Sequence, residues 1–141
     1  MAGVIQFPPP AGAEATPTTV QTGSFSFATG INGSQSAWQE LIASTTAAAL
    51  RSVFSGSIGT DTATGGLRFS IQIGTGAAGS EVVKCTIRVK PTANVSIASM
   101  ADYNPTLFLR IASGTRLAIR ATNEDSGGAA TCVGGYNVYE T

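Results

Sequence analysis

The sequence predicts an all-β chain: an antiparallel β-sandwich or jelly roll of about eight strands, preceded by an extended proline-rich N-terminal arm. Three observations favour this fold class. Ser, Thr, Ala and Gly supply 70 of the 141 residues and charged residues only 11%, a composition that suits strands and turns better than a helical bundle. Several segments alternate apolar and polar residues with a period of two. Glycine-containing turns separate these segments.

The first segment, residues 1–22, differs from the rest of the chain. Its four prolines lie among small residues, and proline favours extended polyproline II structure over a strand inside a sheet. We therefore divide the chain into this arm and a β-sandwich body, residues 23–141. The arm residues that we expect to contact a partner are its apolar and proline residues Val4, Ile5, Phe7, Pro8, Pro9 and Pro10.

The first part of the body contains two strand signals and one ambiguous stretch. Phe25 and Phe27 fall on one face of a strand, and a second strand is predicted at 38–42. Residues 44–54 are compatible with a helix, because of their alanine run, or with a strand, because of their β-branched and aromatic residues. We prefer a turn followed by a strand over 50–58.

In the following four segments apolar and polar residues alternate most clearly, as expected of strands with one buried and one solvent-exposed face. Their inward-facing residues are Leu67, Phe69, Ile71 and Ile73; Val83, Cys85, Ile87 and Val89; Leu107, Leu109 and Ile111; and Leu117, Ile119 and Ala121. A last strand is predicted over 131–140, with a bulge at Gly134 and Gly135.

Two cysteines are too few for a disulfide scaffold. We prefer two free thiols at Cys85 and Cys132, with a disulfide between them as the alternative.

The composition argues against most kinds of chemistry. The chain contains no histidine, which removes Ser-His-Asp triads, histidine metal sites and histidine acid–base catalysis. Eight basic residues balance eight acidic ones, so a nucleic-acid binder is disfavoured. No apolar run is long enough for a membrane helix, and the start of the chain does not read as a secretory signal. We expect no enzymatic activity, no cofactor, no nucleic acid and no membrane.

Two motifs resemble functional sites but are better explained structurally. Residues 74–79 match the glycine pattern of dinucleotide-binding loops, yet a strand follows where that motif needs a helix. We therefore predict a glycine-rich turn, where glycines supply positive φ angles. Glu124 and Asp125 form the only adjacent acid pair, and we interpret them as a solvated turn rather than as glycosidase carboxylates or a calcium site.

Charge is distributed unevenly along the chain. Residues 68–120 carry a net charge of +5 and the remainder carries −5. One interpretation is a surface that meets an acidic partner, for instance the opposite end of an identical subunit. The other is that charges on exposed strand faces block edge-to-edge aggregation.

Three short segments, 38–45, 71–83 and 111–121, resemble small structural proteins of tailed bacteriophages. The resemblance spans most of the body, residues 37–122, and not the arm. It implies a virion component with a β-sandwich or jelly-roll body, made in the host cytoplasm. It does not decide between head and tail.

We therefore expect a capsid decoration or cement protein. It would bind the major capsid protein or another virion protein, and copies of itself, as a homo-oligomer such as a trimer. Its arm would lie across a neighbour, since proline lowers the ordering cost of an extended segment. The alternative is a tail-associated adhesion or carbohydrate-binding module. In that case sugars would stack on Trp38, Tyr103, Tyr136 or Tyr139, although the alternation around Trp38 favours a core position.

Overall fold

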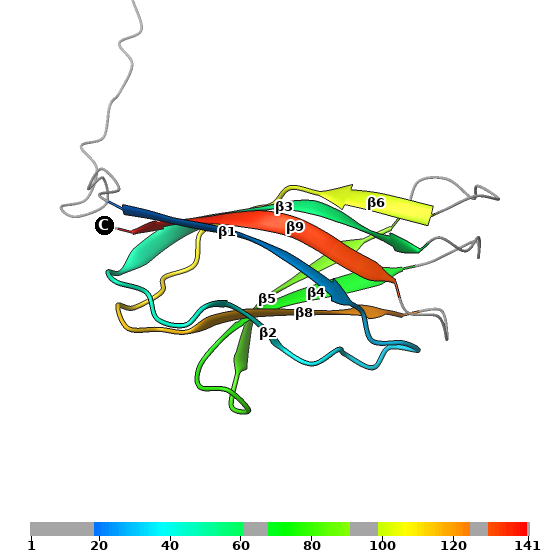
Figure 1. Ribbon diagram of the computed structural model, residues 1–141, viewed down its shortest axis with the longest axis horizontal. Helices are drawn as coiled ribbons and strands as arrows, with labels where there is room; N and C mark the ends of the chain where they lie inside the picture. The colour runs from blue at the N-terminus through cyan, green and yellow to red at the C-terminus, as the bar shows by residue number, and fades with distance from the viewer. Residues whose placement is uncertain (1–18, 61–67, 91–98, 125–129, 141) are drawn as a thin grey trace, which may run out of the picture.

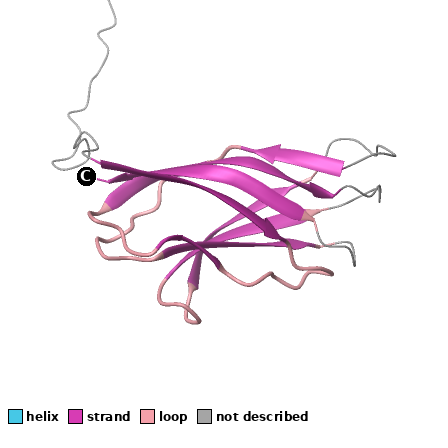
Figure 2. Ribbon diagram, in the orientation of Figure 1, coloured by secondary structure: helices cyan, strands magenta, loops and turns pink. Residues whose placement is uncertain are grey.

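The computed structural model describes residues 19–60, 68–90, 99–124 and 130–140, which form nine strands and no helix. The strands lie in two antiparallel sheets that face each other (Figures 1 and 2). In chain order they are β1 (Thr19–Ala28), β2 (Gln39–Ile42), β3 (Ala49–Thr60), β4 (Phe69–Thr75), β5 (Val82–Val89), β6 (Ser99–Tyr103), β7 (Thr106–Leu107), β8 (Leu117–Asn123) and β9 (Thr131–Glu140). The prediction of an all-β protein built from two antiparallel sheets is confirmed.

The first sheet, sheet A, has the order β1-β9-β3-β6, and β7 also pairs with β3. The second, sheet B, has the order β2-β8-β4-β5. Among the described strands, β4 and β5 are the only consecutive strands that pair with each other. Every other pair joins distant parts of the sequence, up to Thr19 with Glu140 in the pair of β1 and β9.

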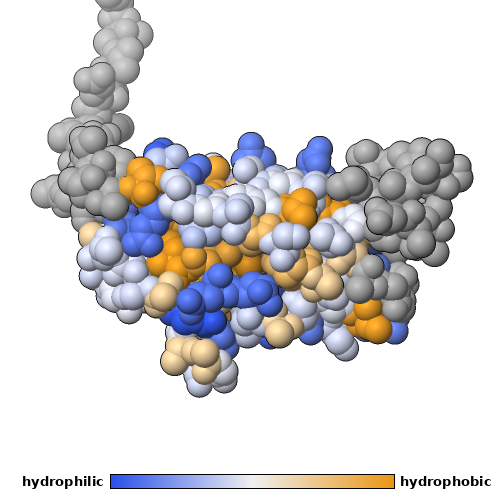
Figure 3. All heavy atoms as spheres, viewed as in Figure 1, coloured by the Kyte–Doolittle hydropathy of each residue, from blue (hydrophilic) through white to orange (hydrophobic). Residues whose placement is uncertain are grey.

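The core lies between the sheets and is built mostly from the predicted inward-facing residues of the alternating segments. Val83 is an exception: it was predicted to face inward but is exposed, because the pairing of β4 with β5 shifts register between Ile73 and Gly74. Leu67 lies outside the described residues. Figure 3 shows hydrophobic residues as a band between the two layers, with hydrophilic residues above and below it. Burying these side chains contributes roughly 1.5–3 kcal/mol each. The largest apolar side chains that are fully buried are Phe54, Ile58, Phe69, Ile71, Ile73, Leu117, Ile119 and Val138.

The body begins earlier in the chain than residue 23. β1 begins at Thr19, so residues 19–22, which we had placed in the arm, pair with β9. Residues 1–18, including Val4, Ile5, Phe7 and Pro8–Pro10, lie outside the described residues. The stretch 44–54, compatible with a helix or a strand, enters β3 at Ala49, as we preferred.

One strand was missed and another is shorter than predicted. β6 has no clear alternation in its sequence, and it forms by pairing with the distal half of β3. The strand predicted around 107–111 is reduced to β7 and an isolated bridge between Ala49 and Ile111. Its alternation is nevertheless correct, because Leu107 and Leu109 pack against the core and Phe108 points away from it.

The predicted bulge at Gly134 and Gly135 is wrong. The registers of β9 with β1 and with β3 run through both glycines without a shift. A Cβ on Gly134 would lie 2.3 Å from the carbonyl oxygen of Ser55 and 2.8 Å from the hydroxyl of Tyr103. The glycine is needed because Tyr103 crosses the inner face there, where its hydroxyl donates to the carbonyl oxygen of Val133 at 2.9 Å.

An acidic side chain is fully buried at the end of β9. The Glu140 carboxylate accepts hydrogen bonds from the Gln21 amide at 2.6 Å and from the Thr46 backbone N–H at 3.0 Å. The Thr46 hydroxyl donates to its other oxygen. These donors replace the water that a buried carboxylate loses. Glu140 therefore does not belong to the acidic surface that the charge distribution suggested.

Candidate functional site

The outer face of sheet A is broad and nearly uncharged. Its residues alternate with the core residues along β1, β9 and β3, so paired neighbours such as Thr22, Asn137 and Val53 form rows across the sheet. Arg51 is the only charged residue on the outer face of these three strands. The outward residues are Val20, Thr22, Ser24, Ser26, Ala28, Thr131, Val133, Gly135, Asn137, Tyr139, Arg51, Val53, Ser55 and Ser57. Such a face loses little hydration free energy when a partner covers it.

One end of this face carries larger side chains, which we call the aromatic end of sheet A: Val20, Arg51, Phe108 and Tyr139. Val20 and Arg51 both pair with Tyr139, and the Arg51 guanidinium lies 4.0 Å from the centre of the Tyr139 ring. Phe108 follows Leu107, the partner of Ser52, so the antiparallel register brings it level with Arg51. Phe108 is 80% exposed, so this end presents a large apolar side chain to solvent next to Tyr139 and Arg51.

The aromatic residues considered for sugar stacking lie in different environments. Tyr103 and Tyr136 are buried and belong to the core, so neither ring is free to stack on a sugar. Tyr139 lies at the aromatic end. Trp38 is half-buried and lies outside the core cluster, which contradicts the core position favoured by its alternation. It packs against Gly74, whose added Cβ would lie 2.6 Å from the indole ring.

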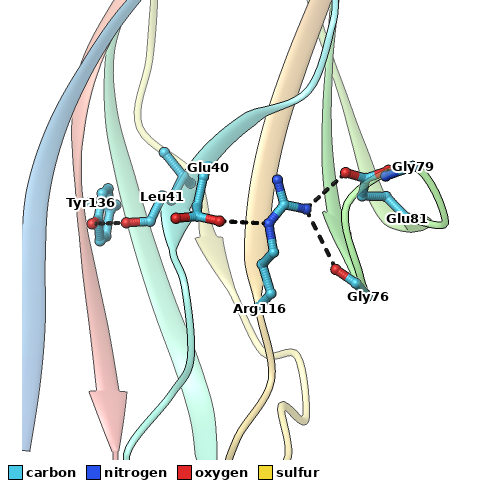
Figure 4. A network of polar contacts seen from close by, with 7 residues as sticks. All are labelled: Glu40, Leu41, Gly76, Gly79, Glu81, Arg116 and Tyr136. Atoms are coloured by element: carbon cyan, nitrogen blue, oxygen red, sulfur yellow. Dashed lines mark hydrogen bonds and ion pairs between the residues drawn. The ribbon is translucent and has the colours of Figure 1, made fainter.

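A polar network on sheet B fixes the turn between β4 and β5 (Figure 4). The Arg116 guanidinium forms ion pairs of 2.7 Å with Glu40 and with Glu81. The second oxygen of Glu81 accepts the Gly79 N–H at 3.0 Å. Gly76 and Gly79 have φ angles of 124° and 83° and form a turn between strands, as predicted, whereas Gly74 of the same motif lies within β4.

Burial and hydrogen bonding shift the pKa values of two members of this network, Glu81 and Arg116. The side chain of Glu81 is 4% exposed and that of Arg116 is 14% exposed. Burial alone would raise the pKa of the Glu81 carboxyl. The hydrogen bonds from its own backbone N–H and from Arg116, together with the Arg116 charge, lower that pKa overall. The hydrogen bonds to Glu40 and Glu81 raise the pKa of Arg116. Both groups therefore stay ionised at neutral pH.

The same sheet is tied to sheet A by Tyr136. This side chain reaches from β9 across the core, and its hydroxyl donates to the carbonyl oxygen of Leu41 next to Glu40 (Figure 4). Burial raises the pKa of Tyr136, so the hydroxyl keeps its proton at neutral pH. This hydrogen bond connects β9 in sheet A to β2 in sheet B.

The outer face of sheet B contains a shallow hollow with a volume of about 460 Å³. We call it the polar groove; its lining residues are Gln35, Ser70, Gln72, Thr86, Arg88 and Glu124. Beside it, Arg120 lies 4.3 Å from the centre of the Trp38 ring and donates to the Gln72 side-chain oxygen at 2.7 Å. Sequence reasoning missed this site, because neutral residues from the loop before β2 and from β4 and β5 carry no motif.

Within the described residues, no group of three or more His, Cys, Asp or Glu residues could hold a metal ion. Cys85 and Cys132 are both free thiols, as we preferred. Burial raises the pKa of Cys85, and it raises the pKa of Cys132 to about 11. Neither is a reactive thiolate at neutral pH.

Glu124 is half-buried rather than solvated, and Asp125 lies outside the described residues. In the part of the chain that the structure describes, no helix could span a membrane.

Comparison of the chain with models of protein families, with curated proteins and with solved structures finds no match.

Proposed function

We propose that this chain is a structural protein of a bacteriophage virion, a capsid decoration or cement protein that binds the head shell and copies of itself. It acts by binding and catalyses no reaction. Its partners are the major capsid protein or another virion protein. The observation that carries this proposal is the outer face of sheet A, which is wide, nearly uncharged and bordered by exposed aromatic and apolar side chains.

The order of strand pairing supports a jelly roll, the finer form of the fold. β6 and β7 both pair with β3 and can be taken as one interrupted strand. The pairs are then nested: β1 with β9, β2 with β8, β3 with β6 and β7, and β4 with β5. A long antiparallel hairpin rolled into two sheets has this pattern. Jelly rolls occur in viral capsid proteins and in lectins.

The arm provides the second contact of the proposal. It joins β1 at Thr19, next to Val20 at the aromatic end of sheet A. Proline-rich segments dock on surfaces lined by aromatic residues, because their extended form costs little entropy to hold. We therefore place Pro8–Pro10 and Phe7 of one copy against Phe108 and Tyr139 of a neighbouring copy. Repetition in a symmetric oligomer, which we propose is a trimer, adds these weak contacts together.

Self-association is tested by sedimentation velocity on the full chain and on three variants. The full chain should sediment as a trimer. Phe108→Ser and deletion of residues 1–18, which leaves β1 complete, should both shift the protein to the monomer. Val82→Ser is the matched control, since Val82 is 57% exposed but lies on sheet B, and it should assemble like the original. A monomeric full chain would refute the self-association.

The virion assignment needs its own measurement. Gradient-purified virus particles from the source of the gene should contain the chain in many copies by quantitative immunoblotting. Purified full chain should also rebind to particles stripped of it, whereas the chain lacking residues 1–18 should not. Particles that lack the chain, or truncated protein that binds with unchanged occupancy, would count against the proposal.

A further inference from the structure

The polar groove on the outer face of sheet B has the chemistry of a ligand site. All six lining residues are polar, and they come from the loop before β2, from β4 and β5, and from the end of β8. The volume of about 460 Å³ falls in the range of about 300–1,000 Å³ found for small-molecule sites. Ser70, one of the lining residues, is itself only 3% exposed.

One polar atom of the groove lacks the partner that its burial requires. The side-chain oxygen of Gln35 is buried and accepts no hydrogen bond from the described residues. Buried acceptors are nearly always satisfied, and an exception calls for a ligand or a bound water. Gln35 lines the groove, so a rotation of its amide would present this unsatisfied oxygen to a donor in the groove.

The side-chain amide of Gln72 is held in one orientation, with its NH₂ group available to donate hydrogen bonds. The Gln72 oxygen accepts from Arg120, and the Arg120 guanidinium is itself packed on Trp38. This contact fixes the orientation of the Gln72 amide and leaves its NH₂ group to donate. The Trp38–Arg120 pair, which the assembly proposal does not use, thereby positions a groove residue.

The charges of the groove limit the class of ligand. Arg88 is exposed and forms no ion pair or hydrogen bond with a described residue, and Glu124 is the only carboxylate. Within the groove one cation lies with one anion, which does not favour phosphate or sulfate, and a single carboxylate does not make a metal site. Arg68 and Lys90 line an adjoining hollow that shares Arg88 and Glu124, so the sulfate arm of the test below separates anion binding from sugar binding. The groove also contains the side-chain amides of Gln35 and Gln72 and the hydroxyls of Ser70 and Thr86. These groups can both donate and accept hydrogen bonds, which suits a ligand that carries hydroxyl groups.

We propose that the polar groove binds a saccharide unit through Gln35, Gln72, Thr86 and Arg88. Sugar hydroxyls each donate and accept, so they can satisfy the Gln35 oxygen and the Gln72 NH₂ group together. This site differs from stacking on Tyr103, Tyr136 or Tyr139, and it does not depend on self-assembly. The assembly face lies on sheet A, so both surfaces can be occupied in one molecule.

The test is an NMR titration of the ¹⁵N-labelled full chain with a panel of single sugars: glucose, galactose, mannose, their N-acetylamino derivatives and glucuronate. Each is added to about 50 mM, above the millimolar Kd expected for one sugar ring. The side-chain NH₂ signals of Gln35 and Gln72 should move with at least one sugar. The signal of Gln21, which is bound to Glu140 in sheet A, should not move.

A matched pair of variants locates the binding. Arg88→Gln should weaken the affinity for the best sugar about tenfold or more, because a charge-assisted hydrogen bond is lost. Lys84→Gln makes the same charge change on the same strand outside the groove and should leave the affinity within about twofold. The proposal is overturned if no sugar moves the Gln35 and Gln72 signals, if sodium sulfate moves them equally, or if both variants weaken binding alike.

Discussion

The two adjacent glycines of β9 give a sharp test of the packing between the sheets. In β9, Gly134 faces the core and Gly135 faces outward, and neither has a positive φ angle. A Cβ on Gly134 would lie 2.3 Å from the Ser55 carbonyl oxygen and 2.9 Å from the ring of Phe25. A Cβ on Gly135 would meet only the Gly23 carbonyl oxygen, at 3.2 Å. The same substitution should therefore have different effects at neighbouring positions.

The expected magnitudes follow from these distances. Because backbone atoms have to move, Gly134→Ala should cost about 1–3 kcal/mol of the free energy of unfolding, as other overpacked cores do. At about 3–4 °C per kcal/mol, this lowers the Tm by roughly 3–12 °C. Gly135→Ala should stay within about 1 kcal/mol of the original, because reduced entropy of the unfolded chain offsets the tight contact.

Urea unfolding followed by tryptophan fluorescence, with thermal unfolding as a check, measures both variants. Tyr103→Phe serves as a third variant. It removes the hydroxyl that lies 2.8 Å from the added Cβ on Gly134 but leaves the Ser55 oxygen in place. In that background Gly134→Ala should still destabilise, by less than in the original. Equal losses at Gly134 and Gly135 would instead favour a bulge and refute the close-packing argument.

Three further outcomes are expected. Arg116→Gln should speed hydrogen exchange at the Gly79 N–H, because Glu81 loses the partner that positions it; Arg110→Gln, at an exposed residue, should not, and equal rates would contradict the network. The pKa of Glu81 is lower in the fold than its ordinary value of 4.5, so its stabilising effect is complete above that pH and is lost as the pH falls through the folded pKa. Glu81→Gln should therefore reduce the loss of unfolding free energy on acidification below about pH 4.5; an unchanged pH profile would contradict this. With a pKa of about 11, Cys132 should react with iodoacetamide at pH 8 only after unfolding, and rapid labelling of the folded protein would show that its burial is wrong.

Local patterns were enough to predict most of the strands. The alternation of Ile71 and Ile73 or of Leu117 and Ile119 depends only on which face of a strand is buried, and that face is the same in any β-sandwich. β6 was missed because it is defined by its partner β3, which lies about forty residues earlier. The glycine pair was misread because close approach of Tyr103 and a bulge both require glycine.

The candidate surfaces were harder to predict, for a related reason. The outward position of Phe108 could be read from its alternation with Leu107 and Leu109, and an aromatic residue there is a usable signal. The polar groove could not be found in this way. Gln35, Ser70 and Thr86 are common residues in separate segments. The register of β4 with β5 and the docking of the loop before β2 on β8 bring them to one hollow.

The nested pairing has a consequence for how the molecule is made. The turn between β4 and β5 lies near the middle of the chain. These two strands can therefore pair while later residues are still being synthesised. β1 is synthesised before the other described strands but pairs last, because Thr19 meets its partner only when Glu140 has been translated. During that interval its backbone amides remain open to strands of other nascent chains. Newly made protein should thus be more vulnerable to misassembly than the finished molecule.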